Sequence, residues 1–255
     1  MRTPALLILT CITACAAACT VVATVSAQNA PWSYEGKTGP VNWGRLDPSN
    51  RACSSGRQQS PIDIRHAHLN KALVPIEFHY IAGGVTLENN GHTVFVRVHP
   101  GSYILYGGVR YDLVGYDFHH PSEVPVNGRL TDMDVELHHK SADGKIVIIE
   151  ARLIEDIDSP NATMALLWES LPPTAGDSRK VTAMVSAMGL LPADRSYWTY
   201  MGSLTTPPCT EGVRWFVMQS PVTVSQQQYR AFTALFGVNS RPAQDTNGRR
   251  IEANR

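Results

Sequence analysis

The chain has 255 residues, of which 43% are hydrophobic and 17% are charged, and 22 basic and 22 acidic side chains give it a formal net charge of zero. Without an excess of either charge, the chain is not expected to bind nucleic acid or acidic lipid surfaces non-specifically. The normal apolar content excludes a disordered chain, and the length is that of one globular domain with its own core.

The first 27 residues are expected to be a signal peptide, followed by a domain over residues 28–255. An uncharged, alanine-rich apolar run covers Thr3–Ala27 and ends in three small residues, which is typical of cleavage before Gln28. The run is long enough to span a bilayer, so an uncleaved anchor is one alternative. A lipoprotein anchor at Cys15 is another, because Ile-Thr-Ala-Cys resembles a bacterial lipobox. Each alternative implies export, to the periplasm or outside the cell, and no membrane contact beyond the leader.

Export changes the interpretation of the cysteines. Three of the five lie in the leader, and Cys53 and Cys209 remain. Two cysteines in an oxidising compartment are most simply a disulfide, with two buried free thiols as the alternative. Closing so long a loop is expected to stabilise the fold by roughly 4–5 kcal/mol.

Short runs rich in β-branched and aromatic residues predict a mainly β, mostly antiparallel single domain with a few peripheral helices. Helices are expected at Asn161–Leu171, Val181–Leu190 and Ser225–Leu235, the last opening with a capping box. Strands are expected at Gly84–Glu88, Thr93–His99, Ser102–Tyr106, Arg110–His119, Met133–His139, Lys145–Ile154 and Val213–Gln219.

Alternation along three of these strands predicts a shared polar face. Val114, Tyr116 and Phe118 are expected on the core face of the first strand. The opposite faces of the three strands carry Gly115, Asp117 and His119, then Asp134, Glu136 and His138, then Ile148, Glu150 and Arg152. Buried charges are costly unless they are paired or bound to metal, so this face is either a site or a cluster of ion pairs.

Short motifs occur along nearly the whole mature chain: Trp32–Tyr34, Gly39-Pro40 with Trp43, Gln59–Ile64, Asn89–His92, Pro121–Glu123 and Ser203–Cys209. Together they resemble the motifs of α-carbonic anhydrases of the bacterial exported type. The resemblance implies a large twisted, mainly antiparallel sheet with a conical cavity, and the reversible hydration of CO₂ to bicarbonate at a zinc ion held by three histidines. It also places Cys53 and Cys209 where such enzymes carry their disulfide.

Much of the family's catalytic machinery has a counterpart here. The resemblance implies that His92 is the proton shuttle, that Thr205 accepts a hydrogen bond from the hydroxide, and that Glu123 orients Thr205. It places Thr206 at the substrate, Leu204 and Trp215 in the walls of the CO₂ pocket, and Tyr34 and Asn90 along the cavity's water network.

The metal ligands depart from the family pattern. Asp117, His119 and Glu136 stand where the resemblance places three zinc-binding histidines. Four neighbouring positions differ as well: where the family pattern has a glutamine, a glutamate, a valine of the CO₂ pocket and a glycine, this chain has Gly115, Asp134, His138 and Glu150. Two ionised carboxylates would cancel the charge with which zinc acidifies its water, so weak or absent CO₂ hydration is expected at neutral pH.

Three interpretations of this centre stay open. Asp117, His119 and Glu136 can still bind zinc or another divalent cation, or His138 can join His119 and one carboxylate in a set that suits iron or manganese. In the third, no metal binds and Arg152 or a histidinium neutralises the acids. The last would resemble acatalytic carbonic-anhydrase-related proteins, with a binding or structural role.

Overall fold

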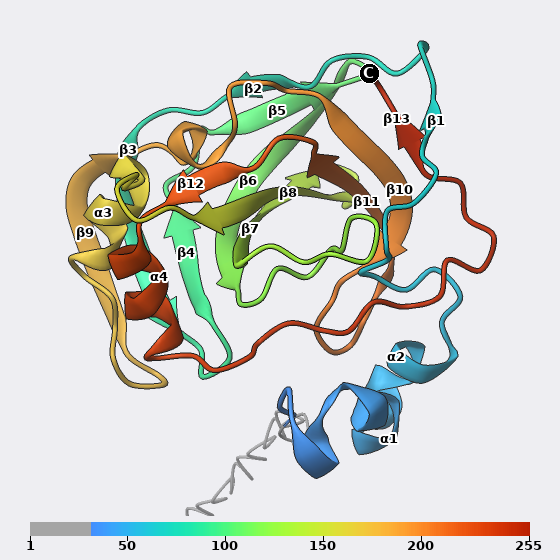
Figure 1. The fold of residues 1–255 in the computed structure, drawn as a ribbon, viewed down its shortest axis with the longest axis horizontal. Coiled ribbons are helices and arrows are strands. Elements are labelled where there is room, and N and C mark those ends of the chain that lie inside the picture. The colour runs from blue at the N-terminus through green and yellow to red at the C-terminus, as the bar shows by residue number, and fades with distance from the viewer. Residues whose placement is uncertain (1–31) are drawn as a thin grey trace, which may run out of the picture.

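One large curved sheet forms the body of the protein in this computed structural model, which describes residues 32–255 (Figure 1). The expected leader, its cleavage point and Cys15 lie outside the described residues. Of the helices within residues 32–255, none has both the length and the apolar character that a membrane crossing requires.

The strands follow the order β1-β13-β10-β11-β8-β7-β6-β4-β3-β9, with β12 pairing with β8, and β5 pairing with both β2 and β6. Most pairings are antiparallel, and β1 with β13 and β8 with β11 and β12 are parallel. The bounds are β1 His68–Leu69, β2 Glu77–His79, β3 Gly83–Asn89, β4 Val94–Val98, β5 Tyr103–Tyr106, β6 Val109–His119, β7 Met133–Ser141, β8 Ile146–Glu155, β9 Ser178–Val185, β10 Tyr197–Ser203, β11 Glu211–Met218, β12 Val222–Val224 and β13 Glu252–Ala253. The predicted mainly β fold with a large, mostly antiparallel sheet is confirmed.

Short helices lie at the margins of the sheet. In Figure 1, α3 and α4 lie together at one side of the sheet, and α1 and α2 lie together near the N-terminal end of the described chain. The capping box of α4 is present, since Ser225 Oγ accepts from the amide of Gln228 and Gln228 Oε1 accepts from the amide of Ser225. The bounds are α1 Trp43–Leu46, α2 Ala52–Ser55, α3 Ala162–Trp168 and α4 Gln226–Thr233, with 3₁₀ helices at Gly36–Thr38, Pro40–Asn42, Pro48–Asn50 and Ala187–Leu190.

The helix predicted at Val181–Leu190 is wrong. Its first part belongs to β9, which pairs with β3, and only Ala187–Leu190 turns as a 3₁₀ helix. Val181 and Val185 are buried while Met184 is exposed, so the apolar pattern of the paired strand replaces the helical one. Pairing along an existing sheet overrides a weak local preference for helix. Strand β10 was also not predicted.

A bulge in β6 corrects the prediction for one residue of its core face. The register between β6 and β7 shifts between Leu113 and Gly115, which leaves Val114 exposed. Beyond the bulge the predicted alternation holds, because Tyr116 and Phe118 are fully buried in the main core.

The predicted disulfide is present and joins Cys53 in α2 to Cys209, which lies 156 residues away in the sequence. Both cysteines are buried against Trp43, so the bond ties the helical N-terminal segment to the loop after β10.

The double variant Cys53→Ser with Cys209→Ser should unfold in urea with a free energy lower by about 4–5 kcal/mol, because the unfolded chain regains the entropy of the open loop. Reductant should lower the stability of the wild type to that of the variant and leave the variant unchanged. A variant as stable as the oxidised wild type would contradict this role.

Candidate functional site

A cluster of carboxyl and imidazole groups lies where β6, β7 and β8 run side by side. Asp117 on β6 is opposite Glu136 on β7, and Glu136 is opposite Glu150 on β8. Two pairs further along, and so on the same face, His119 is opposite Asp134. The polar faces of the three strands therefore meet, as the alternation predicted.

The cluster has a deep part and an accessible end. His119, Asp134, Glu136 and Glu150 are buried. The side chains of Asp117 and His138 keep 13% and 24% of their exposure. Solvent therefore reaches the acids from the side on which Asp117 and His138 lie.

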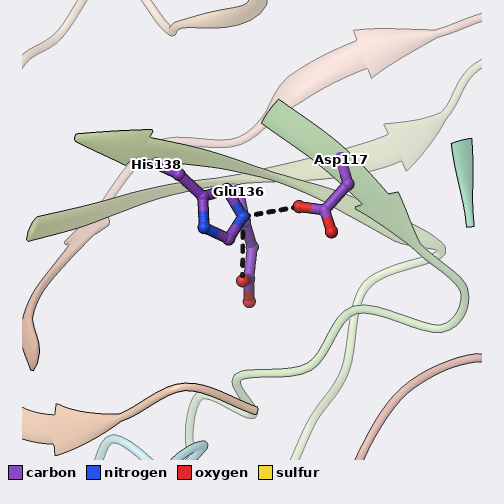
Figure 2. A group of neighbouring side chains, drawn as sticks. All are labelled: Asp117, Glu136 and His138. Atoms are coloured by element: carbon purple, nitrogen blue, oxygen red, sulfur yellow. Dashed lines mark hydrogen bonds and ion pairs between the residues drawn. The ribbon is translucent and has the colours of Figure 1, made fainter. Parts of the chain in front are cut away.

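His138 contacts two carboxyl groups at this accessible end. Its Nε2 lies 2.7 Å from Asp117 Oδ1 and 4.0 Å from Glu136 Oε2. Figure 2 shows this one ring nitrogen facing the carboxyl groups of Asp117 and Glu136. The ligand atoms of the three side chains thus lie within 4.8 Å of one another.

A chain of hydrogen bonds holds the deep part in place. His119 Nδ1 lies 3.1 Å from Asp134 Oδ1, and Asp134 Oδ2 accepts from the amide of Glu123 at 2.5 Å. Glu123 Oε1 in turn accepts from the amide of Arg241 at 2.6 Å. Because Asp134 occupies Nδ1, the other ring nitrogen of His119 is left for the interior of the cluster.

Several buried carboxylate oxygens have no hydrogen-bond partner. Among the described residues these include Glu123 Oε2, Glu136 Oε1 and both oxygens of Glu150. An unpaired charged oxygen in such a place costs several kcal/mol, so each group must carry a proton or face a cation.

The electrostatics of the cluster show the same crowding of negative charge. Burial, followed by the neighbouring acids, raises the pKa of Glu136 and Glu150 well above the ordinary range of a glutamate. Burial alone would lower the pKa of His119, but Glu123, Asp134 and Asp117 outweigh it and raise this pKa to about 10. Burial acts to raise the pKa of Asp117, and His138 and His119 together bring it below the usual value.

Two groups of side chains present their ligand atoms close enough to share a cation. One is Asp117, Glu136 and His138, the other is His119, Glu123 and Glu136, and the ligand atoms of each lie within 4.8 Å of one another. Imidazole and carboxylate are donors that divalent cations accept, and unpartnered carboxylate oxygens are what such a cation would satisfy. The residues present therefore fit a divalent cation, although not a cage of neutral imidazoles.

The three predicted ligands are divided between these groups. Asp117 belongs to the first, His119 to the second, and Glu136 to both. His119 Nε2 lies 4.0 Å from Asp117 Oδ2, so the two remain neighbours. His138, predicted at the substrate pocket, lies in the first group.

The other predicted residues surround the cluster at different distances from it. Thr205 is buried near Glu123, where burial raises the pKa of the carboxyl and the Thr205 hydroxyl works to lower it. Trp215 is fully buried in β11 and donates to the carbonyl of Ser203, and Leu204 packs on the same apolar cluster. Thr206 follows on the half-buried loop after β10.

His92 lies outside the cluster and is partly exposed. Its ring stacks on Trp32 with the centroids 3.6 Å apart, and it lines a surface hollow with Tyr34 and Asn239. Partial burial lowers the pKa of His92, which keeps the ring neutral at pH 7. Burial, followed by the acids of the cluster, raises the pKa of Tyr34.

Arg152 acts on the acids through its charge, which works to lower the pKa of Glu150 against the burial and neighbouring acids that raise it. Its guanidinium donates to the carbonyl of Gln219 and lies 5.5 Å from the ring of Trp198. No ion pair between Arg152 and a carboxylate forms within residues 32–255. Any neutralising positive charge from side chains in contact with these acids is therefore that of His119 and His138.

Sequence reasoning missed Arg241, which supports the site from far along the chain. Its amide fixes Glu123, and its buried guanidinium donates to Gln59 Oε1 and to the carbonyls of Ser60 and Cys53. No spacing signal links it to the strands, because these contacts span up to 188 residues.

Phe95 on β4 was missed as well, and it explains Gly115. A Cβ on Gly115 would lie 2.4 Å from Phe95 Cζ and 2.7 Å from the carbonyl oxygen of Val96. The ring of Phe95 also contacts that of His138, with the centroids 5.9 Å apart. The ring of Phe95 thus fills the space in which the glutamine expected at position 115 would lie.

Gly115→Ala should lower the free energy of unfolding by about 1–3 kcal/mol, because Phe95 and the backbone of β4 must move. In a Phe95→Ala background the same change should cost less, which a double-mutant cycle in urea measures. Gly84→Ala in β3 is the control, since its Cβ would meet nothing closer than 3.4 Å. An equal cost of Gly115→Ala in both backgrounds would exclude this contact.

Comparison with known proteins agrees with the fold. Residues 38–255 match the family model of eukaryotic-type carbonic anhydrases. The carbonic anhydrases of Pectobacterium carotovorum and Klebsiella pneumoniae are 37% and 38% identical over 221 residues, which cover 86% of this chain and 89% of each relative.

Solved structures give the same result. A hyperthermostable carbonic anhydrase identified from an active hydrothermal vent chimney matches with a TM-score of 0.84 and 39% identity, over 88% of this chain and 99% of that one. Dioscorin complexed with ascorbate matches with a TM-score of 0.81 and 30% identity, over 88% and 97%. The chain belongs to the eukaryotic-type, or α, carbonic anhydrase family.

Proposed function

We propose that this protein is an exported α-carbonic anhydrase family member whose cavity floor binds a divalent cation among carboxylates and hydrates CO₂ weakly or not at all at neutral pH. One observation carries the proposal: five carboxyl groups and only two imidazoles gather at the floor. The acids are Asp117, Glu123, Asp134, Glu136 and Glu150, and the imidazoles are those of His119 and His138.

Charge is the reason for the weak activity. Zinc held by three neutral histidines, as in the family, supplies a water of lowered pKa for the attack on CO₂. Asp117 and Glu136, when ionised, would cancel the double positive charge of a cation that they hold. Water at this centre is therefore not acidified near pH 7.

The family's remaining machinery supports a site that still handles a small molecule. Glu123, held by the amide of Arg241, would orient the Thr205 hydroxyl, and half-buried His92 would carry protons. Leu204, Thr206 and Trp215 would line the CO₂ pocket. His138 puts a polar ring where the family pattern has valine, which disfavours CO₂ there.

A metal-free binding or structural protein is the second candidate. The contacts of His138 with Asp117 at 2.7 Å and of His119 with Asp134 at 3.1 Å favour it, because they pair each imidazole with a carboxyl group without any cation. Dialysis against micromolar Mn²⁺ or Zn²⁺ separates the candidates: bound metal supports the first, and protein that remains free of metal supports the second.

Export to the periplasm or beyond the cell follows from the leader expected over residues 1–27 and from the disulfide. A bond between Cys53 and Cys209 persists in an oxidising compartment and not in a reducing cytosol.

Asp117→His with Glu136→His should raise zinc-dependent CO₂ hydration at least about 100-fold, which corresponds to about 2.7 kcal/mol of transition-state stabilisation. Adding His138→Val should raise it further by restoring an apolar wall. Stopped-flow hydration at pH 7.5 measures the rates.

Asp117→Asn with Glu136→Gln is the matched control, since it removes the same charges without providing imidazoles, and it should give no comparable gain. Zinc-loaded wild type that is already as fast as the histidine variant would overturn the charge argument.

A further inference from the structure

We infer that the cation centre holds two divalent cations bridged by Glu136. The inference rests on the proposed cation site and extends it from one cation to two.

The two groups of ligand atoms share one residue and are otherwise alike. Asp117 and His138 accompany Glu136 in the first, and Glu123 and His119 accompany it in the second. Each cation would thus receive one imidazole, one carboxylate of its own and one oxygen of the shared carboxylate. Carboxylate-rich sets with one histidine for each metal are the composition of dinuclear iron and manganese centres in helical bundles.

Glu136 has the two free oxygens that a bridge requires. Its Oε2 lies 4.0 Å from His138 Nε2, on the side of the first group. Its Oε1 is buried and has no hydrogen-bond partner. An ionised carboxylate accepts on both oxygens at once, so the side chain can serve two cations about 3.5–4 Å apart.

Buried carboxylate oxygens without a hydrogen-bond partner support a cation independently of the distances between the ligand atoms. Glu123 and Glu136 are each 1% exposed, and each has one carboxylate oxygen without a partner. These two residues are members of the second group. Asp134 holds His119 by Nδ1, which fixes the ring with its other nitrogen available as a ligand.

Arg241 does not take the place of a second cation beside Glu123, because its guanidinium makes its hydrogen bonds to Gln59 and to backbone carbonyls.

The donor set also indicates the class of cation. Carboxylate groups outnumber imidazoles in each group. Such a donor set suits Mn²⁺ or Fe²⁺, whereas the zinc ion of the family is held by three histidines. The partly exposed side chains of Asp117 and His138 leave a path from solvent to the first position.

Equilibrium dialysis of the folded mature protein against Mn²⁺ at pH 7.5, with metal counted by mass spectrometry, tests the inference. Two Mn²⁺ per chain are expected, and their electron paramagnetic resonance should show spin coupling between close ions. One Mn²⁺ per chain, or two without coupling, would overturn the bridge and leave the proposed cation site standing. Protein that binds none would overturn both.

Variants assign the two positions. His138→Val should bind one Mn²⁺ and lose the spin coupling, and it replaces a partly exposed ring with the residue that the family pattern has there. His119→Gln should also bind one. Glu136→Gln should bind at most one, at least about tenfold more weakly, because an amide cannot bridge.

His79→Gln is the matched control, because His79 is exposed and also lies 3.9 Å from a carboxylate, that of Glu77. It should still bind two Mn²⁺ with spin coupling. Loss of a Mn²⁺ in this control, or retention of two coupled ions in His138→Val, would show that the ligands are elsewhere.

Discussion

Burial of negative charge on one sheet face is the constraint on which the rest of this structure depends. β6, β7 and β8 are central strands, and the register sets Asp117, Glu136 and Glu150 side by side across them. Their desolvation must be offset by protons, imidazolium rings or metal cations. The fold can tolerate such a face because the opposite one packs on the main apolar core, which includes Tyr116, Phe118 and Leu137.

The deep part of the face is rigid and the outer part is not closed. Asp134 is tied to both His119 and the amide of Glu123, and Arg241 fastens Glu123 from the C-terminal region. These bonds hold the carboxyl and imidazole groups of the deep part in place. Asp117 and His138 contact each other at the accessible end, where exchange with solvent is possible. Fixed groups beneath the accessible Asp117 and His138 are what the proposed cation site requires.

The sequence was sufficient to predict the acidic face and insufficient for its surroundings. Alternation has a period of two, so Asp117, Glu136 and Glu150 could be assigned to one face without coordinates. Val114 escaped the same rule because a bulge adds a residue that alternation cannot detect. Val181–Leu190 failed because pairing with β3 decides its structure. Arg241 and Phe95 act through contacts between distant segments, which one sequence without a fold does not reveal.

The altered positions form one interdependent set. Phe95 fills the space beside Gly115 and packs on His138, so a glutamine at 115 and the His138 ring belong to different arrangements of the pocket. His138 in turn lies 2.7 Å from Asp117, which would lose its contact if His138 became valine. Exchanging the ligands alone therefore brings back imidazoles without the groups that orient them, because the support behind a metal ligand affects affinity and activity nearly as much as the ligand itself. Rates close to those of the family would require changes at 95, 115 and 138 together with those at 117 and 136.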